Sequence, residues 1–220
     1  MRTSPIALMA ALTISATPVS AAPYELSVIV TENGRTEPVA NAVVSVDDDR
    51  DSPPVSAEIY QKDRAFHPHV LVIPVGSSVD FPNRDNTQHH VYSFSPAKTF
   101  NIELYAGRPE APIVFDKPGI VELGCNIHDH MQGFVVVTDT AAVGQTDTSG
   151  QVTLSIDRQR IEGSQDSVAL EIWHPRLPDN TRPVTREIKP GEPAIVTLDL
   201  EPEPAAEGSL DRLQQRFREL

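Results

Sequence analysis

Residues 124–131 read Gly-Cys-Asn-Ile-His-Asp-His-Met and place three potential metal ligands at equal intervals. Cys125, His128 and Met131 follow the spacing C-x2-H-x2-M. Cys125 is the only cysteine, which excludes an internal disulfide and a zinc site with two cysteines from this chain. Thiolate, thioether and imidazole together favour copper, because both sulfur donors are soft and zinc normally takes no thioether.

A copper site of this kind needs a second imidazole from another part of the fold. Two histidines and one cysteine with a weak axial methionine make a blue-copper electron-transfer site. His89 and His90 are the candidates, and they precede an apolar run at 91–94. Neighbouring residues on a strand point to opposite faces, so we expect only one of the two to reach the metal.

Short apolar segments separated by turn residues extend on both sides of this loop, without helical periodicity. Twenty prolines and eleven glycines among 220 residues favour short strands and turns over long helices. We therefore expect an all-β chain with an antiparallel sandwich or barrel. Strands are expected at 24–30, 38–46, 70–75, 78–81, 91–94, 113–115, 120–123, 134–138, 151–156, 168–173, 184–188 and 194–200.

The two ends of the chain differ from this pattern. Residues 1–21 combine Arg2 with a short apolar stretch and end on Val-Ser-Ala, which is typical of a signal peptide. We therefore expect a periplasmic protein with no transmembrane segment after signal removal. Residues 201–220 are expected to form a polar linker and a short helical or disordered tail. A formal net charge of -13 disfavours binding to nucleic acid.

Residues 66–138 resemble the cupredoxins, the family of plastocyanin and amicyanin. The matching residues are Phe66, 70–72, Gly76, Val79, Phe81, Asn83, Asp85, His89, Val91, Gly119 and the C-x2-H-x2-M loop. The whole chain is also similar to exported proteins of the methylamine-utilisation type, which share the stretches 92–98 and 124–129. The resemblance implies a Greek-key sandwich with one mononuclear type 1 copper. By the same resemblance, the copper ligands are His89, Cys125, His128 and Met131.

Other histidines leave alternatives open. His130 lies inside the ligand loop and competes with Met131 for the fourth position, although the spacing favours Met131. His90 stands where many cupredoxins carry asparagine after the first ligand. His67 and His69 alternate along one segment, so they form either a second, weaker metal site or solvated surface side chains.

The segments on either side of the copper region lack enough strands to close a core alone. Parts of both resemble the transthyretin-like, carboxypeptidase-regulatory sandwich. We expect 23–52 and 140–200 to pair as a small accessory β-sandwich. The cupredoxin copper domain, 55–138, is then inserted in it, with two consecutive domains as the alternative.

These features predict an exported carrier of single electrons that works with an unidentified redox partner protein. The alternative is a copper-binding carrier or sensor without an electron-transfer role, suggested by the extra histidines and the accessory sandwich. An enzyme is the least favoured class, because only one copper set is visible and no nucleophile or acid–base group is evident.

Overall fold

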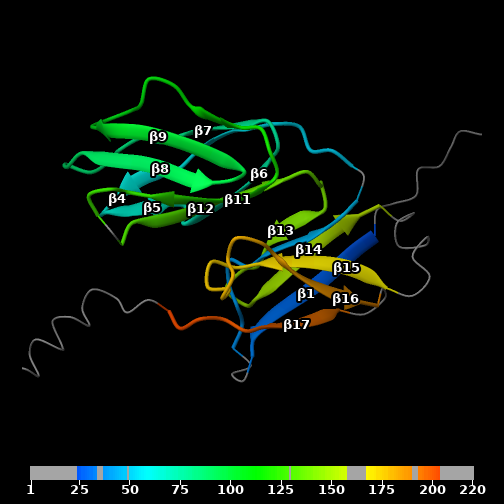
Figure 1. Cartoon of the computed structure of the whole chain (residues 1–220). Coiled ribbons are helices and arrows are strands. Elements are labelled where there is room, and N and C mark those ends of the chain that lie inside the picture. Colours follow the sequence, from blue (N-terminus) through cyan, green and yellow to red (C-terminus); the bar gives the residue numbers. More distant parts are fainter. Residues whose placement is uncertain are drawn as a thin grey trace, which may run out of the picture.

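The computed structural model describes residues 24–33, 37–48, 50–128, 130–157, 167–189 and 193–203. These residues form seventeen β-strands in five sheets without an α-helix, which confirms the expected all-β class (Figure 1). The signal peptide expected at 1–21 and residues 204–220 of the expected C-terminal tail lie outside the described residues. Within the described part, no helix is long and apolar enough to cross a bilayer.

One half of the molecule is built on a five-stranded sheet with the order β6-β12-β11-β8-β9. All neighbours in it are antiparallel except β6 and β12, which run parallel. Side chains alternate between its faces, so that β8 buries His89, Val91 and Ser93 and exposes more of the residues between them. The strands are β6 (Val70–Pro74), β8 (His89–Ser95), β9 (Lys98–Tyr105), β11 (Gly119–Gly124) and β12 (Gln132–Thr138).

A second layer covers one face of this sheet. It consists of a three-stranded sheet, β10-β7-β3, and of the hairpin β4–β5. Phe66, Phe81 and Phe115 from this layer pack with Leu123 and Val135 of the larger sheet, and all five side chains are almost fully buried. The strands are β3 (Ser56–Glu58), β4 (Tyr60–Lys62), β5 (Ala65–His67), β7 (Ser77–Asp80) and β10 (Ile113–Phe115).

The two ends of the described chain pair with each other in the other half of the molecule. Strand β1 lies between β14 and β17, antiparallel to the first and parallel to the second. Strand β2 lies between β13 and β15, and β16 follows β15 at the edge. The strands are β1 (Tyr24–Glu32), β2 (Val43–Val46), β13 (Val143–Gln145), β14 (Gln151–Ile156), β15 (Val168–Trp173), β16 (Val184–Ile188) and β17 (Ala194–Leu198).

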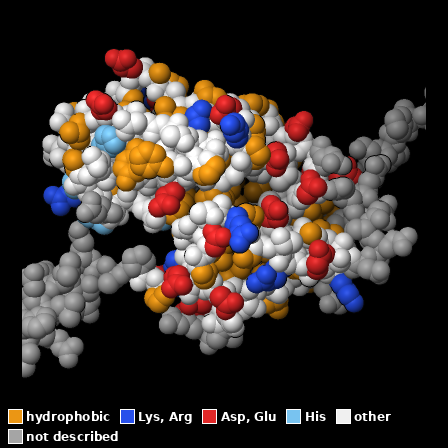
Figure 2. Space-filling model, in the orientation of Figure 1, with side chains coloured by type: hydrophobic (Ala, Val, Ile, Leu, Met, Phe, Trp, Pro, Cys, Tyr) orange, Lys and Arg blue, Asp and Glu red, His pale blue; other side chains and the backbone are white. Residues whose placement is uncertain are grey.

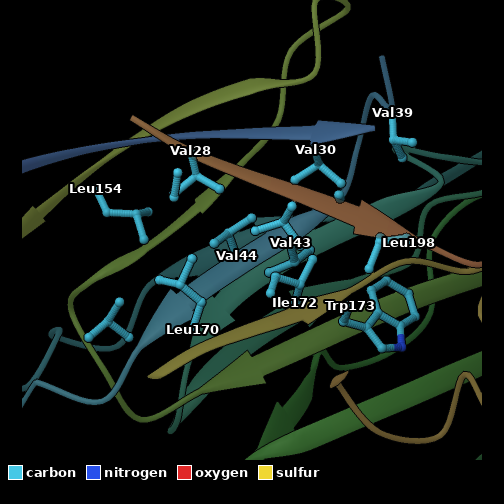
Figure 3. Close-up of a cluster of buried hydrophobic side chains, with 14 of the residues drawn as sticks. Val28, Val30, Val39, Val43, Val44, Leu154, Leu170, Ile172, Trp173 and Leu198 are labelled. Atoms are coloured by element: carbon cyan, nitrogen blue, oxygen red, sulfur yellow. The ribbon is translucent and has the colours of Figure 1, made fainter. Parts of the chain in front are cut away.

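The core of this second half extends into the half built on the five-stranded sheet. Valine, leucine and isoleucine side chains fill the space between the two sheets, and Trp173 lies at one end of this cluster beside Ile172 and Leu198 (Figure 3). Val70, Phe134 and Val136 of the five-stranded sheet belong to the same core, and the Phe134 ring lies 5.1 Å from that of Trp173. Strand β12 is thus buried on both faces, and β6 contributes side chains to both cores. The division into an inserted copper domain and an accessory sandwich remains a prediction.

One expected strand is shorter than predicted, and five strands were not expected, namely β3, β4, β5, β9 and β13. The strand expected over 38–46 covers only Val43–Val46, because Asn41 takes a left-handed φ of 61° and Pro38 makes only an isolated bridge. Strand β9 was not expected, since only Phe100, Ile102 and Tyr105 of this edge strand pack toward the core. Figure 2 shows hydrophobic side chains interspersed with acidic and basic ones over the visible face of both halves.

Candidate metal centre

The loop between β11 and β12 carries three of the four expected ligands. The hairpin closes where Gly124 pairs with Gln132. Beyond that pair, the Met131 N–H donates to the His128 carbonyl at 2.9 Å, which curls the loop into a turn. Cys125 and Met131 are 3% and 2% exposed and belong to one apolar cluster, whereas His128 is half-buried. The hairpin therefore presents a thiol, an imidazole and a thioether at one end of the core.

The neighbouring strand β8 supplies the second imidazole. Gly124 pairs with Tyr92 of β8, which brings the start of β8 beside the ligand loop. His89 is fully buried, and its Nδ1 lies 3.8 Å from Cys125 Sγ. The Nδ1 of His128 lies 3.7 Å from the same sulfur. The potential ligand atoms of these three residues all lie within 4.8 Å of one another.

Of the two adjacent histidines, the structure brings His89 to this cluster and turns His90 away. The His90 ring lies 5.5 Å from the ring of Tyr92, two positions further along the same face of β8. Its Nδ1 is buried and has no hydrogen-bond partner among the described residues. Opposite faces for neighbouring strand residues are the arrangement that the pleat requires.

Met131 and His130 differ in their surroundings. The Met131 side chain is buried in the apolar cluster that contains Cys125. His130 is exposed, and its ring centroid lies 6.3 Å from that of His128. The ligand group found in the described part consists of His89, Cys125 and His128 and does not include His130. A buried thioether next to the thiol suits a weak sulfur ligand, so Met131 stays the predicted fourth ligand.

The carboxylate of Asp85, for which the sequence predicted no specific role, contacts this cluster. Asp85 Oδ2 lies 2.7 Å from His89 Nε2, the ring nitrogen on the side away from the thiol. The backbone N–H groups of Asp63 and Arg64 donate to the same carboxylate at 2.7 and 3.0 Å. Its place in the cupredoxin-like run, four residues before His89, was a signal in the sequence, but its contacts with Asp63 and Arg64 span more than twenty residues of the chain.

The electrostatic environment favours a neutral His128 and an ionised Asp85. Burial, followed by the proximity of His89, lowers the pKa of His128 from its ordinary value. Burial alone would raise the pKa of Asp85. Hydrogen bonds from the Arg64 N–H and from His89 outweigh that effect, and the pKa of Asp85 is lowered. A neutral imidazole keeps a lone pair for a metal ion.

The donor set fits copper. One thiol and two imidazole Nδ1 atoms converge within 4.8 Å, and the buried Met131 belongs to the same cluster as the thiol. Soft sulfur donors select copper, whereas calcium and magnesium would require several oxygen ligands. The group formed by His89, Cys125, His128 and Met131 is therefore consistent with a type 1 copper site.

The other two histidines that the sequence marked for a metal lie apart from this group. His67 Nε2 is 3.1 Å from the Lys62 carbonyl oxygen, and the His67 ring stacks on Tyr60. His69 meets the ring of Phe134 edge-on, with centroids 5.6 Å apart. In the described ranges these two histidines belong to no group of three potential ligands.

Parts of this chain are similar to solved copper proteins, although no family model and no curated protein matches it. A copper-containing nitrite reductase from Thermus scotoductus SA-01 is 26% identical over 41% of this chain and 24% of its own, with a TM-score of 0.36. This chain thus spans about a quarter of that reductase. A purple cupredoxin from Nitrosopumilus maritimus is 26% identical over 37% of this chain and 99% of its own, with a TM-score of 0.33. For amicyanin from Paracoccus versutus the identity is 16%, the coverage 43% and 97%, and the TM-score 0.33.

Proposed function

We propose that this protein is an exported type 1 copper protein that carries single electrons between redox partners in the periplasm. The observation that carries the proposal is the convergence of two histidine Nδ1 atoms on Cys125 Sγ, at 3.8 and 3.7 Å. Two imidazoles and a thiolate, with a thioether close by, are the donors of an electron-transfer copper site. The proposed ligands are His89, Cys125, His128 and Met131.

Each ligand has its own task in this proposal. Cys125 binds as the thiolate, because a coordinating thiol is deprotonated outright. His89 and His128 bind through Nδ1, the nitrogen that each already turns toward the sulfur. Met131 adds a weak thioether donor. Copper, when bound, supplies one-electron chemistry by alternating between its Cu(I) and Cu(II) states.

The surrounding fold suits a carrier of electrons. His89 lies on a strand between two neighbours, and Cys125 and Met131 lie directly at the ends of the β11–β12 hairpin. Ligands on regular strands with packed surroundings stay in place more accurately than ligands on free loops. A site that changes little between two oxidation states keeps the reorganisation small, which is what rapid electron transfer requires.

Export is part of the same proposal. It rests on the signal-like residues 1–21, which lie outside the described residues. An oxidising compartment endangers a free thiol through oxidation and mispairing. Cys125 is only 3% exposed, so the fold itself protects the thiol that the site needs.

Addition of copper(II) to the purified mature protein tests the ligand set. An intense visible absorption from thiolate-to-copper charge transfer is expected, and Cys125→Ala is expected to abolish it. His130→Ala is the matched control, because it removes an exposed imidazole from the same loop and is expected to keep the colour. A colourless complex, or colour that survives Cys125→Ala, would refute the proposal. Loss of colour in His130→Ala would move the fourth ligand from Met131 to His130.

A copper carrier or sensor without electron transfer is the second candidate. It is favoured by the exposed His130, whose ring lies 6.3 Å from His128 at the edge of the site and offers an alternative donor during exchange. Repeated cycles of reduction and reoxidation in the presence of a copper chelator separate the two functions. A redox protein keeps its copper through the cycles, whereas a carrier releases it to the chelator.

A further inference from the structure

The Asp85 carboxylate makes three hydrogen bonds beside the proposed copper ligands. Its Oδ1 accepts the Asp63 N–H at 2.7 Å, and its Oδ2 accepts the Arg64 N–H at 3.0 Å. Oδ2 also contacts His89 Nε2 at 2.7 Å. The Asp85 side chain is 10% exposed, and that of His89 is fully buried. Both carboxylate oxygens are therefore engaged, and the contact with His89 is shielded from water.

The two N–H groups come from the turn of the hairpin β4–β5. Asp63 and Arg64 are the two residues of this turn, and both take left-handed φ values, 53° and 56°. A two-residue hairpin turn of this kind requires positive φ at both positions, which is unfavourable for residues other than glycine, asparagine or aspartate. The hydrogen bonds to Asp85 offset part of that cost, so the turn and the carboxylate stabilise each other.

Asn83 fixes the backbone that carries Asp85. Its Nδ2 donates to the carbonyls of Thr87 and Tyr105 at 2.8 and 3.1 Å. Its Oδ1 accepts the Asp85 N–H at 2.9 Å. Asn83 is 7% exposed, so these bonds form in a largely water-free environment where they are strong. The carboxylate is thus held from the hairpin side and from its own loop.

We infer that Asp85 is a positioning residue that keeps the His89 ring protonated at Nε2 and leaves Nδ1 bare toward Cys125. A carboxylate whose oxygens already accept two backbone N–H groups is an acceptor, so the ring nitrogen that meets it must be the donor. A neutral imidazole carries one proton, and Nδ1 is then the nitrogen with the free lone pair. That atom is the one that lies 3.8 Å from the sulfur.

The consequence for the metal rests on the proposed function. A carboxylate bonded to a ligating imidazole fixes the tautomer and the ring orientation and makes the ligand more basic, and its loss typically costs 10–100-fold in metal affinity. A more basic ligand with a negative charge behind it favours Cu(II) over Cu(I). Asp85 therefore strengthens copper binding and lowers the reduction potential of the site.

The tautomer is tested in the metal-free protein, without any variant. The ¹⁵N spectrum of labelled protein at pH 8 separates the protonated from the bare ring nitrogen of His89, because one nitrogen of a neutral imidazole carries the proton and the other a free lone pair. Nε2–H with a bare Nδ1 is the expected result. A proton on Nδ1, or a mixture of both tautomers, overturns the inference whether or not the protein binds copper.

The copper consequence is tested with Asp85→Asn. An amide has a single acceptor oxygen and cannot accept hydrogen bonds from His89 and from both turn N–H groups. A mixture of His89 tautomers is therefore expected. Copper(II) affinity in a chelator competition is expected to fall 10–100-fold. Copper(I) affinity is expected to fall less, and each tenfold difference between the two losses raises the reduction potential by about 59 mV.

Asp116→Asn is the matched control, since it removes an exposed carboxylate that pairs with Lys98. It is expected to leave affinity and potential unchanged. An Asp85→Asn protein with the affinity and potential of the parent overturns the assigned task. A parent protein that binds no copper refutes the proposed function instead, and the tautomer measurement still decides the contact between Asp85 and His89.

Discussion

His174 is a buried imidazole in the second half of the molecule, and it makes the stability of the fold depend on pH. It is 8% exposed, and its Nδ1 accepts the Arg176 N–H at 3.2 Å. The ring also hydrogen-bonds to the backbone of Ala40, which joins the loop before β2 to the loop after β15. Burial, followed by the positive charge of Arg176, lowers the pKa of His174 from 6.5 to about 4.

The size of the effect follows from that difference. Between pH 6.5 and about 4 the unfolded chain binds a proton at this position and the folded chain does not, so unfolding is favoured as the pH falls. The contribution of His174 to the free energy of unfolding is fully present above pH 6.5 and is lost as the pH falls through about 4. At 1.36 kcal/mol for each pKa unit the complete loss is roughly 3.4 kcal/mol. At pH 4.5 about 2.5 kcal/mol of it has been lost.

Urea unfolding of the parent and of His174→Asn at pH 7.5 and pH 4.5 measures this contribution. Asparagine does not titrate, and its Oδ1 can accept the Arg176 N–H in place of Nδ1. The variant is expected to be less stable at pH 7.5 but to lose about 2.5 kcal/mol less than the parent between the two pH values. The subtraction removes the titration of all other groups. Equal losses in the two proteins would show that His174 titrates normally in the fold.

Three further predictions concern packing. Gly124→Ala places a Cβ 2.7 Å from Tyr92 Cζ, so we expect the free energy of unfolding in urea to fall by roughly 1–3 kcal/mol. Adding Tyr92→Leu to the same chain should restore part of this loss, and an unchanged unfolding midpoint in Gly124→Ala would contradict the prediction. Phe134→Ala is expected to lower the free energy of unfolding by about 3–5 kcal/mol, whereas Phe94→Ala, at a position 79% exposed, is expected to change it by no more than about 0.5 kcal/mol. Equal changes in the two variants would refute the core shared by the two halves. The excised segment 55–138 leaves Phe134 and its apolar neighbours uncovered and is expected to aggregate or unfold more readily than the full chain, which light scattering and thermal unfolding can test.

Much of the local architecture could be predicted from the order of the residues. The β11–β12 hairpin and its ligand loop are continuous in the chain, so the spacing of Cys125, His128 and Met131 already specifies which side chains can meet. The all-β class followed from short apolar segments and frequent turn residues for the same reason. Strand β9 was missed because an edge strand with three core-facing residues carries only a weak apolar pattern.

The sequence by itself determined the donor chemistry, since one cysteine, two histidines and one methionine within seven residues admit few metals. The family resemblance already named His89 over His90, but only the tertiary structure showed why His89 turns toward the thiol, because strand pairing and pleat select the face. Only the tertiary structure brought Asp85 against His89 and tied it to a hairpin turn more than twenty residues away. Contacts of this kind depend on how sheets pack and pair, and no short-range pattern in the chain records them.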